Sequence, residues 1–194
     1  MLYIFKVNRT PFIAKCVIDA QKMHKYLCSL VHTDRKSVNL LYKLDILHDL
    51  LYLQSDIRPD ESPYLKLLYT EDMDAVLAKM HNEYEIHILV TTDTHMKKTV
   101  NGATKRVYVP SLKRPEWISE KLKRNGIESY IIKESAKRDV RFVHKSDRGG
   151  KASITIFDFD VYGKITDIDA LRRAWHTGMG LHKAYGNGLF LLYR

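Results

Sequence analysis

The order of strand and helix patterns in the second half of the chain constrains the fold more than any other feature. Runs of alternating apolar residues are typical of strands, and runs with helical spacing are typical of helices. The order here is strand, helix, two strands, helix, strand, which is the ferredoxin-like split βαβ arrangement. The strand patterns cover 84–92, 129–135 with 139–145, 153–163 and 188–194, and the helical patterns cover 114–126 and 167–176.

A looser copy of the same order occupies the first 80 residues. The run Leu2–Asn8 alternates like a strand, and Asp19 is the expected N-cap of a helix whose apolar stripe ends near His32. Two alternating runs then predict a hairpin over 39–56. The run YLKLLYT follows, and DMDAVLAKM at 72–80 has helical spacing. The first 80 residues are therefore expected to form a small α+β unit.

The chain length fits two such units. At 194 residues and 45% apolar content, the chain can bury a core as one large domain or two small ones. We predict an α+β protein made of two tandem ferredoxin-like (RRM-like) domains, at 1–82 and 83–194. Sheets of this shape commonly bind single-stranded or structured RNA, although a fold by itself is an analogy for function.

The positive charge of the chain is concentrated in one region. The net charge is +9, and the segment 95–151 alone holds sixteen Lys or Arg against six Asp or Glu, so the remaining sequence is close to neutral. Interleaved aromatic residues such as Tyr108 and Trp117 indicate a folded surface and not a disordered tail. The block favours a polyanionic partner, and the alternative is a solvated basic face. Within it, Lys97, Lys98 and an Asn101-Gly102 turn signal predict a basic hairpin over 94–110.

Other features argue against several protein classes. The sequence shows no secretory leader pattern and no apolar run of 18 residues that could span a bilayer, so we expect a cytoplasmic protein. Cys16 and Cys28 are twelve residues apart, which matches no metal-ligand or redox spacing. We expect both to be buried free thiols.

Near its end the chain reads GMGLHKAYGNGL, with Lys183 among four glycines. Glycines beside a lysine favour close approach of the backbone to a phosphate. The spacing matches neither the P-loop nor the dinucleotide fingerprint, which argues against a nucleotide cofactor. Two interpretations remain, namely contact with an RNA backbone and a tight connection between the last helix and the last strand. The glycines concerned are Gly178, Gly180, Gly186 and Gly188.

Several blocks in this order resemble the CasE family of CRISPR-associated endoribonucleases, which process repeat RNA in type I-E systems. The resemblance covers nearly the whole chain. The final block is similar to the family's G-[IV]-G-x-x-K-[AS]-x-G-x-G-L-L ending, with Phe190 in place of the second leucine. The blocks are KMHKYLCSLV, NLLYKLDILHDLLYLQSD, KRVYVP, PEWISEKLKRNGI and GMGLHKAYGNGLFLLY.

This resemblance implies a fold, an activity and a catalytic residue. Members of the family have two tandem ferredoxin-like domains, and they cut the repeat transcript at the 3′ base of its hairpin without a metal or another cofactor. They remain bound to the processed RNA with the other subunits of a surveillance complex. The family's catalytic histidine falls on His24. The sequence departs from the family pattern at Gln21, where many members have tyrosine, at Ser29, where some have lysine, and in TTDTHMKK, which lacks the frequent Asn-Pro.

The chemistry of RNA cleavage is compatible with a histidine at this position. On a helical wheel His24 lies at the border of the apolar stripe, which predicts one flank held by packing and the other open to substrate. The 2′-hydroxyl is already tethered beside the scissile phosphate, so proton transfer and charge stabilisation remain for the protein. His24 is expected to act as general base or general acid, with a 2′,3′-cyclic phosphate as the product. Lys22, Lys25 or a basic residue of the second domain could stabilise the charge.

The basic block is expected to hold the RNA hairpin. A protruding hairpin would mainly follow the phosphate backbone, and other cations would extend that surface. Affinity should then fall steeply with salt. The predicted RNA-binding residues are Lys97, Lys98, Lys105, Arg106, Lys113, Arg114, Lys137, Arg138, Arg141, Lys145, Lys151 and Lys183.

Two other functions compete with this hypothesis. The first is a non-catalytic RNA-binding or scaffolding subunit of a surveillance complex, which the departure at Gln21 favours. The second is a metal-dependent nuclease, which is less favoured because no compact cluster of acidic residues and histidines has ligand spacing. His176 and His182 flank the glycine stretch and are reserve candidates for catalysis or RNA contact. The remaining scattered histidines are interpreted as structural or surface residues: His48, His81, His87 and His95.

Overall fold

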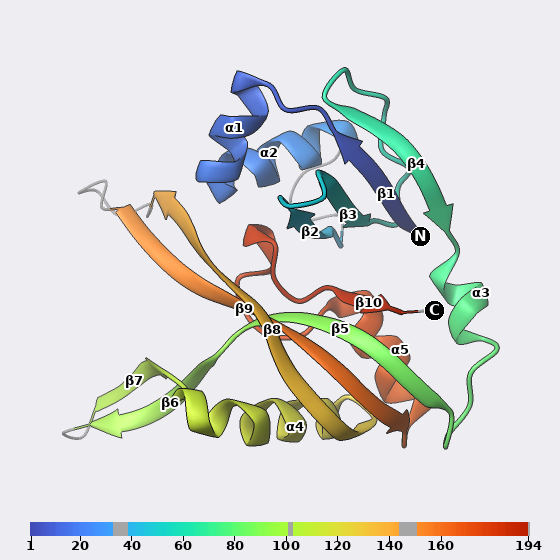
Figure 1. Cartoon of the computed structure of the whole chain (residues 1–194), viewed down its shortest axis with the longest axis vertical. Helices are drawn as coiled ribbons and strands as arrows, with labels where there is room; N and C mark the ends of the chain where they lie inside the picture. The colour runs from blue at the N-terminus through green and yellow to red at the C-terminus, as the bar shows by residue number, and fades with distance from the viewer. Residues whose placement is uncertain (33–38, 101–102, 144–150, 194) are drawn as a thin grey trace.

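Two four-stranded antiparallel sheets form the molecule, one from each half of the chain (Figure 1). The computed structural model describes residues 1–32, 39–100, 103–143 and 151–193. Both sheets have the strand order of a ferredoxin-like unit, so the predicted α+β class is confirmed.

The first sheet has the order β2-β3-β1-β4, with every neighbouring pair antiparallel. Two consecutive helices cover one of its faces, and their apolar side chains share a core with Phe5 and Leu51. The fully described segment 55–64, between the third and fourth strands, forms no helix, so this unit is a reduced version of the fold. The elements are β1 (Leu2–Val7), α1 (Pro11–Ile18), α2 (Ala20–Leu30), β2 (Leu41–Asp45), β3 (Leu50–Gln54) and β4 (Leu65–Glu71).

Asp19 joins the two helices of the first unit. Its carboxylate accepts hydrogen bonds from the backbone N–H of Gln21 at 3.0 Å and of Lys22 at 3.4 Å, which is the predicted N-cap of α2. Helix α1 is an addition to the predicted elements, and Thr10 caps it through Ile13 while Pro11 opens its first turn. The chain therefore enters α2 from another helix and not from a loop.

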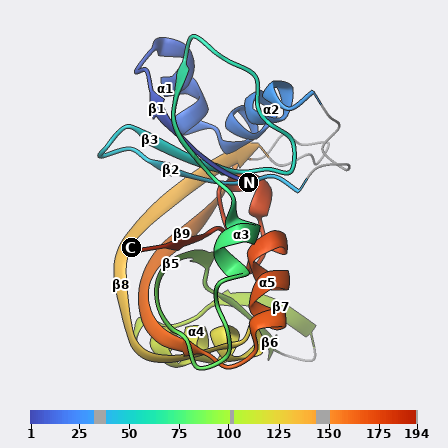
Figure 2. The same ribbon diagram turned by 90° about the vertical axis from the view of Figure 1, so that its right-hand side faces the viewer.

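The second sheet has the order β10-β5-β9-β8. Helices α4 and α5 supply Leu122 and Trp175 to a core with Ile88 and Phe159, and Figure 2 shows how the sheet curves around these helices. Asp167 caps α5 as predicted, with its carboxylate accepting from two backbone N–H groups. The elements are β5 (Glu85–Asp93), α4 (Arg114–Arg124), β8 (Ile127–Val143), β9 (Lys151–Ile165), α5 (Ile168–Thr177) and β10 (Phe190–Leu192).

Strand β8 is the longest element of the fold. The runs predicted separately at 129–135 and 139–145 belong to one strand of 17 residues, bent by two bulges, between Ser129 and Ile131 and between Glu134 and Ala136. Its far end reaches the first unit, where Arg141 forms an isolated β-bridge with Asp19. This strand brings the basic segment of the chain to the start of α2.

The remaining elements are short. The predicted basic hairpin is confirmed as β6 (His95–Val100) and β7 (Ala103–Tyr108), which project from the second sheet (Figure 1). The helix expected at 72–80 is shorter, as α3 (Met73–Leu77), and the turn signal Asn101-Gly102 lies outside the described residues. Two 3₁₀ turns complete the fold, η1 (Ser111–Lys113) and η2 (Lys183–Tyr185).

Polar contacts fasten the two sheets to each other. Lys43 of β2 forms a buried ion pair with Asp158 of β9, and Gln54 donates a hydrogen bond to the carbonyl of Trp175 at 2.8 Å. Met73 and Leu77 of α3 pack into the core of the second sheet. The division into domains at residue 82 stays a prediction.

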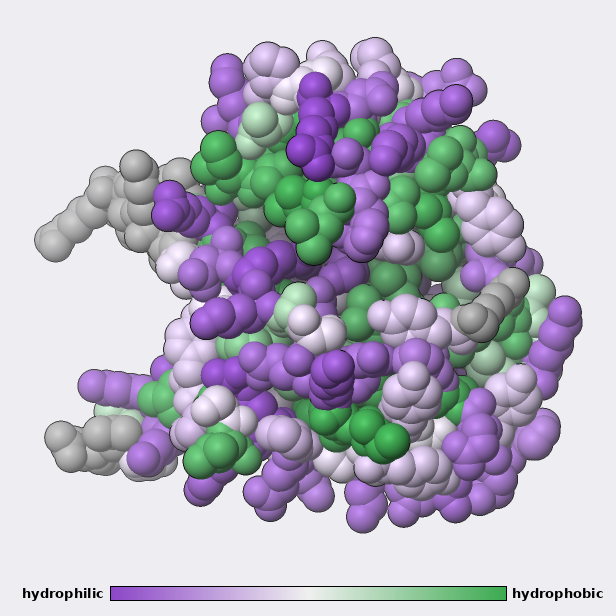
Figure 3. Space-filling model, viewed as in Figure 1, coloured by the Kyte–Doolittle hydropathy of each residue, from purple (hydrophilic) through white to green (hydrophobic). Residues whose placement is uncertain are grey.

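The surface of the first unit carries an apolar patch. Ile18, Ile46 and Leu47 are exposed where the end of α1 meets the β2–β3 turn, and Figure 3 shows hydrophobic residues gathered on this half of the molecule. None of the helices in the described ranges is long and apolar enough to cross a membrane.

Candidate functional site

His24 lies one turn after the start of α2, and Cys28 lies one turn further along the same face of the helix. Its Nε2 is 3.6 Å from the Sγ of Cys28, and the side chain is only 8% exposed. The expectation of an imidazole with one open flank is therefore wrong for this structure. The helical wheel places His24 beside the stripe correctly, but neighbouring elements cover the border that the wheel leaves open.

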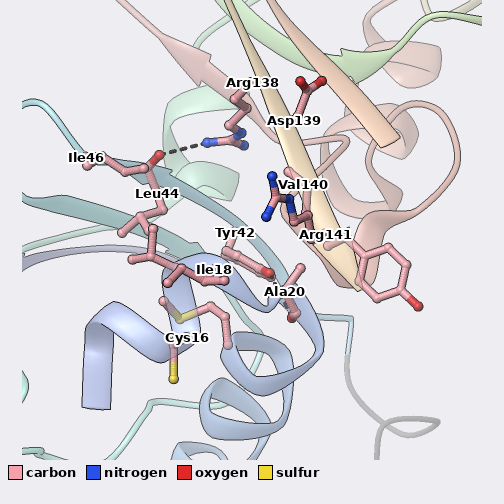
Figure 4. Close-up of a pocket in the computed structure, with 13 residues that line it drawn as sticks. Cys16, Ile18, Ala20, Tyr42, Leu44, Ile46, Arg138, Asp139, Val140 and Arg141 are labelled. Atoms are coloured by element: carbon pink, nitrogen blue, oxygen red, sulfur yellow. Dashed lines mark hydrogen bonds between the residues drawn. The ribbon is translucent and has the colours of Figure 1, made fainter. Parts of the chain in front are cut away.

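The glycine-rich segment lies against the same helix. The hydroxyl of Tyr42 is 3.5 Å from the carbonyl oxygens of both Ala20 and Ala184, so one side chain joins the start of α2 to η2. A cavity of about 300 Å³ opens beside this junction (Figure 4). Its walls come from α1 and α2, from β2, from β8 and from η2, and include Met23, Leu44, Arg141 and Tyr185.

All four predicted glycines have positive φ angles, between 71° and 91°. Three of them, Gly178, Gly180 and Gly188, also have no room for a side chain, and a Cβ on Gly188 would lie 2.8 Å from the carbonyl oxygen of Met179. A Cβ on Gly180 would lie 2.7 Å from Oγ1 of Thr92, and one on Gly178 would lie 2.9 Å from the side chain of Leu41. These glycines therefore let the segment turn tightly against β5 and β2, which is the structural interpretation of the motif.

Asp93 anchors this segment from the end of β5. Its buried carboxylate accepts hydrogen bonds from Nδ1 of His95 at 2.9 Å, Nδ1 of His182 at 3.2 Å and Nδ2 of Asn187 at 2.8 Å. Burial alone would raise the pKa of Asp93, but the hydrogen bonds from the two imidazoles and from Asn187 outweigh it and lower the pKa to about 2. Asp93 therefore stays ionised and ties the hairpin base to the glycine segment.

Lys183 follows His182 directly in the glycine segment. Its side chain is half-buried, and burial lowers the pKa of this ammonium group. No carboxylate of the described residues lies within salt-bridge distance of it. A partly desolvated cation in such a setting is a favourable partner for a phosphate.

The cations of the hairpin are exposed and arranged in cross-strand pairs. Lys97 lies opposite Arg106 and Lys98 lies opposite Lys105, so each face of the hairpin carries two positive charges. Three further predicted residues are also exposed: Lys113 of η1, Lys137 of β8 and Arg141 of β8. These seven side chains are accessible to an anionic partner.

Two predicted RNA-binding arginines are engaged within the protein. Arg114 pairs with Glu134 at 2.5 Å and lies over the ring of Phe157 at 4.2 Å. Arg138 donates to the carbonyls of Leu44 at 2.7 Å and Gly186 at 2.8 Å, and burial lowers its pKa. Lys145 lies outside the described residues, and Lys151 begins β9 with only its backbone described.

The other sequence candidates lie at separate places. His176 pairs with Asp74 at 2.8 Å, away from the His182 site. Gln21 is half-buried in the first turn of α2, and the hydroxyl of Ser29 donates to the carbonyl of Tyr26 at 2.7 Å. Cys16 and Cys28 are both free thiols; Cys16 is buried as expected, whereas Cys28 is only half-buried. In the described part of the chain, no three His, Cys, Asp or Glu side chains gather in a way that could hold a metal.

The two ferredoxin-like sheets in tandem define the fold class, an α+β protein of the double RRM-like type. Within that class, the family model described as CRISPR associated protein matches residues 4–194, so the chain belongs to that family. No curated protein matches the chain by sequence.

Solved structures match over the whole fold. A CRISPR endoribonuclease Cse3 bound to a 19-nucleotide RNA has a TM-score of 0.81 at 15% identity, covering 100% of this chain and 99% of that chain. Cas6e from Escherichia coli has a TM-score of 0.71 at 18% identity, with 98% and 97% covered. A chain of a CRISPR RNA-guided surveillance complex in a pre-nicking state has a TM-score of 0.67 at 22% identity, with 98% of each covered. Together with the family match, these likenesses confirm the predicted resemblance to CasE.

Proposed function

We propose that this protein is an endoribonuclease that cleaves CRISPR precursor RNA at the 3′ base of the repeat hairpin and stays bound to the product. Membership of the family and the full-length likeness to RNA-bound Cse3 support an RNA-processing role. The likeness to a chain of an RNA-guided surveillance complex supports the other subunits of such a complex as partners.

One observation carries the proposal. The start of the helix that holds His24, the end of β8 and the glycine segment meet around one cavity, although they are far apart in sequence. Lys183 and Arg141 bring positive charge to this junction. Phosphodiester transfer requires cations beside the phosphate and a group that exchanges protons; Arg141 lines the cavity, and His24 lies on the helix next to it without lining it.

The reaction needs no group beyond the RNA, water and these side chains. The 2′-oxygen attacks the adjacent phosphorus, the bond from phosphorus to the 5′-oxygen breaks, and the products are a 2′,3′-cyclic phosphate and a 5′-hydroxyl. His24 takes the proton of the 2′-hydroxyl or donates one to the leaving 5′-oxygen, and water exchanges the other proton. Proton transfer by a positioned side chain is typically worth about 10²- to 10⁴-fold in rate. Lys183 and Arg141 stabilise the charge that develops on the phosphate oxygens.

The hairpin β6–β7 would hold the stem of the RNA. Its four exposed cations suit the phosphates that line an A-form groove, and Arg106 is the hairpin residue that can also read a guanine. Lys113 and Lys137 would extend this surface along the second unit.

The test is incubation with the protein's own repeat RNA, with the cut and the product termini mapped, in excess chelator and in its absence. We expect one cut at the 3′ base of the hairpin, a cyclic phosphate, and full activity with chelator. His24→Ala and a 2′-deoxy nucleotide at the cut should each abolish cleavage and leave binding nearly intact. Loss of cleavage in chelator would instead indicate a metal-dependent nuclease.

The burial of His24 favours a second candidate function, a non-catalytic RNA-binding subunit of a surveillance complex. The departure from the CasE pattern at Gln21 points the same way. The same experiment separates the two functions. If the protein binds the repeat hairpin and leaves it uncut, or cuts it as fast after His24→Ala, the catalytic assignment is wrong.

A further inference from the structure

A row of five rings crosses the molecule beside the proposed site. It begins with Tyr108 and His95 at the base of the hairpin, passes through His182 and Tyr185 of the glycine segment, and ends at Phe142 near the end of β8. The successive ring centroids are 4.0, 6.3, 6.2 and 4.5 Å apart. Four separate stretches of the chain contribute to this ring row.

Hydrogen bonds hold the ring row in place. Asp93 accepts hydrogen bonds from both imidazoles, and the hydroxyl of Tyr108 accepts one from the backbone N–H of Thr155 at 3.0 Å. Arg138 fixes the carbonyl of Gly186, directly after Tyr185. The planes of His182 and Tyr185 differ by 14°, and those of Tyr185 and Phe142 by 18°. Three of the five rings are therefore nearly parallel.

Packing of the protein core does not account for these rings. None of the five belongs to either hydrophobic core formed by the described residues. Tyr108 is 45% exposed and Tyr185 and Phe142 are half-buried, whereas the side chains of His182 and His95 are 25% and 14% exposed. Exposed or half-exposed rings held in a fixed orientation are typical of surfaces on which nucleic acid bases stack.

Positive charge accompanies the ring row along its length. Lys183 lies between His182 and Tyr185 in sequence, Arg141 lines the same cavity as Tyr185, and Arg106 of the hairpin is two residues from Tyr108. Aromatic platforms beside cations bind single strands, because every base offers a π-face and the phosphates meet the cations. Paired bases in a stem are already stacked on each other, so the ring row suits unpaired nucleotides.

We propose that the ring row stacks unpaired nucleotides that adjoin the hairpin stem, as a site separate from the cations that hold the stem. The inference rests on the proposed function, because it takes the hairpin RNA as the ligand. Its ligand class is single-stranded RNA of any sequence, with at least two bases in contact.

The test compares two RNAs, the repeat hairpin alone and the same hairpin with its unpaired flanks. Tyr185→Ala and Tyr108→Ala should each weaken binding of the flanked RNA by between about fivefold and about hundredfold, and leave the hairpin alone unchanged. Tyr185→Phe keeps the ring and should bind like the wild type. Tyr130→Ala removes an exposed tyrosine of β8 outside the ring row, and it is the matched control.

A second measurement needs no variant and guards against misfolding of the alanine proteins. A 2-aminopurine base placed in the unpaired flank should lose fluorescence when the wild-type protein binds, because stacking quenches it. Equal weakening of both RNAs, unchanged affinity in both alanine variants, or unquenched 2-aminopurine would each overturn the inference. Failure of the wild type to bind the hairpin at all would instead contradict the proposed function.

Discussion

The hairpin and the contact between the two sheets both carry Lys and Arg side chains, but the surroundings of these side chains differ. On the hairpin, Lys97, Lys98, Lys105 and Arg106 are exposed, and none of them pairs with a carboxylate of the described residues. Between the sheets, Lys43 is buried against Asp158 and Arg138 donates to two carbonyls from separate elements. The first group is available to a ligand, and the second group holds the protein together.

This difference shows what a count of charges can and cannot predict. A cluster of Lys and Arg indicates a polyanionic partner only to the extent that the fold leaves the side chains facing solvent. Arg114 and Arg138 belong to the basic block and serve the protein's own structure. Substitutions in the two groups should therefore separate stability from RNA affinity.

The largest effect is expected at Lys43. Lys43→Met should lower the free energy of unfolding by about 3–5 kcal/mol, because it leaves the carboxylate of Asp158 buried without its charge partner. Urea denaturation followed by circular dichroism measures the change. Lys137→Met, on the exposed part of β8, is the matched control and should leave the midpoint unchanged.

A double variant sharpens this prediction. Burial lowers the pKa of Lys43, and the ion pair with Asp158 offsets only part of that effect. Lys43→Met combined with Asp158→Leu should therefore restore part of the stability that the single variant loses, since two apolar side chains carry no desolvation cost. The remaining loss comes from the buried Thr91 hydroxyl, which donates to Asp158 at 2.8 Å in the wild type. Equal stability of the single variant and the wild type would contradict a structural role for this pair.

A smaller effect is expected at Asp93, and it depends on pH. The pKa of Asp93 is about 2 in the folded protein, below the ordinary value of 3.8, so the ionised form favours folding. This contribution is present in full above pH 4 and is lost as the pH falls through 2. Its size is about 2 kcal/mol.

Urea denaturation of the wild type and Asp93→Asn between pH 7 and pH 2.5 measures this contribution. The difference between the two proteins should shrink as the pH falls below 4. Asp56→Asn, at an exposed position, is the control for the general effect of removing a carboxylate. A difference that does not change with pH would show that the charge of Asp93 contributes nothing.

The smallest effect on stability is expected on the hairpin. Lys97→Ala and Lys105→Ala should leave the urea midpoint unchanged and weaken RNA binding. Each phosphate that a variant no longer neutralises should reduce the salt dependence of log K by about one. Lys66→Ala, an exposed lysine of β4 on the other unit, should change neither quantity. Titrations of repeat RNA at several salt concentrations give the slopes, and an equal weakening in Lys66→Ala would show that the attraction is not localised.

Much of the fold follows from local sequence signals. Asp19, Asp72 and Asp167 each cap a helix, and the alternating runs become strands in the ferredoxin-like order. Helix α1 does not follow from the same reading, although Thr10 and Pro11 carry a start signal, because the stronger cap at Asp19 marks a later start. Asp19 ends the first helix and begins the second, so one residue serves as a boundary for both.

The candidate site was predictable only in part. His24 and the glycines of the last segment have sequence signals, but the burial of His24 depends on which elements cover α2. The ring row and the Asp93 site have no local signal, since Asp93 and His182 are 89 residues apart. Contacts of this kind arise from the topology, which brings the end of β5 beside the last loop.

The contacts of strand β8 limit where insertions and deletions can occur in it. Arg138 reaches the carbonyls of Leu44 and Gly186, and Phe142 stacks on Tyr185, so two side chains four positions apart must point to the same neighbours. Because successive side chains of a strand alternate between faces, adding or removing one residue between them would turn one of the two away. Substitutions between Arg138 and Phe142 should therefore be tolerated far more readily than a change in the number of residues between them.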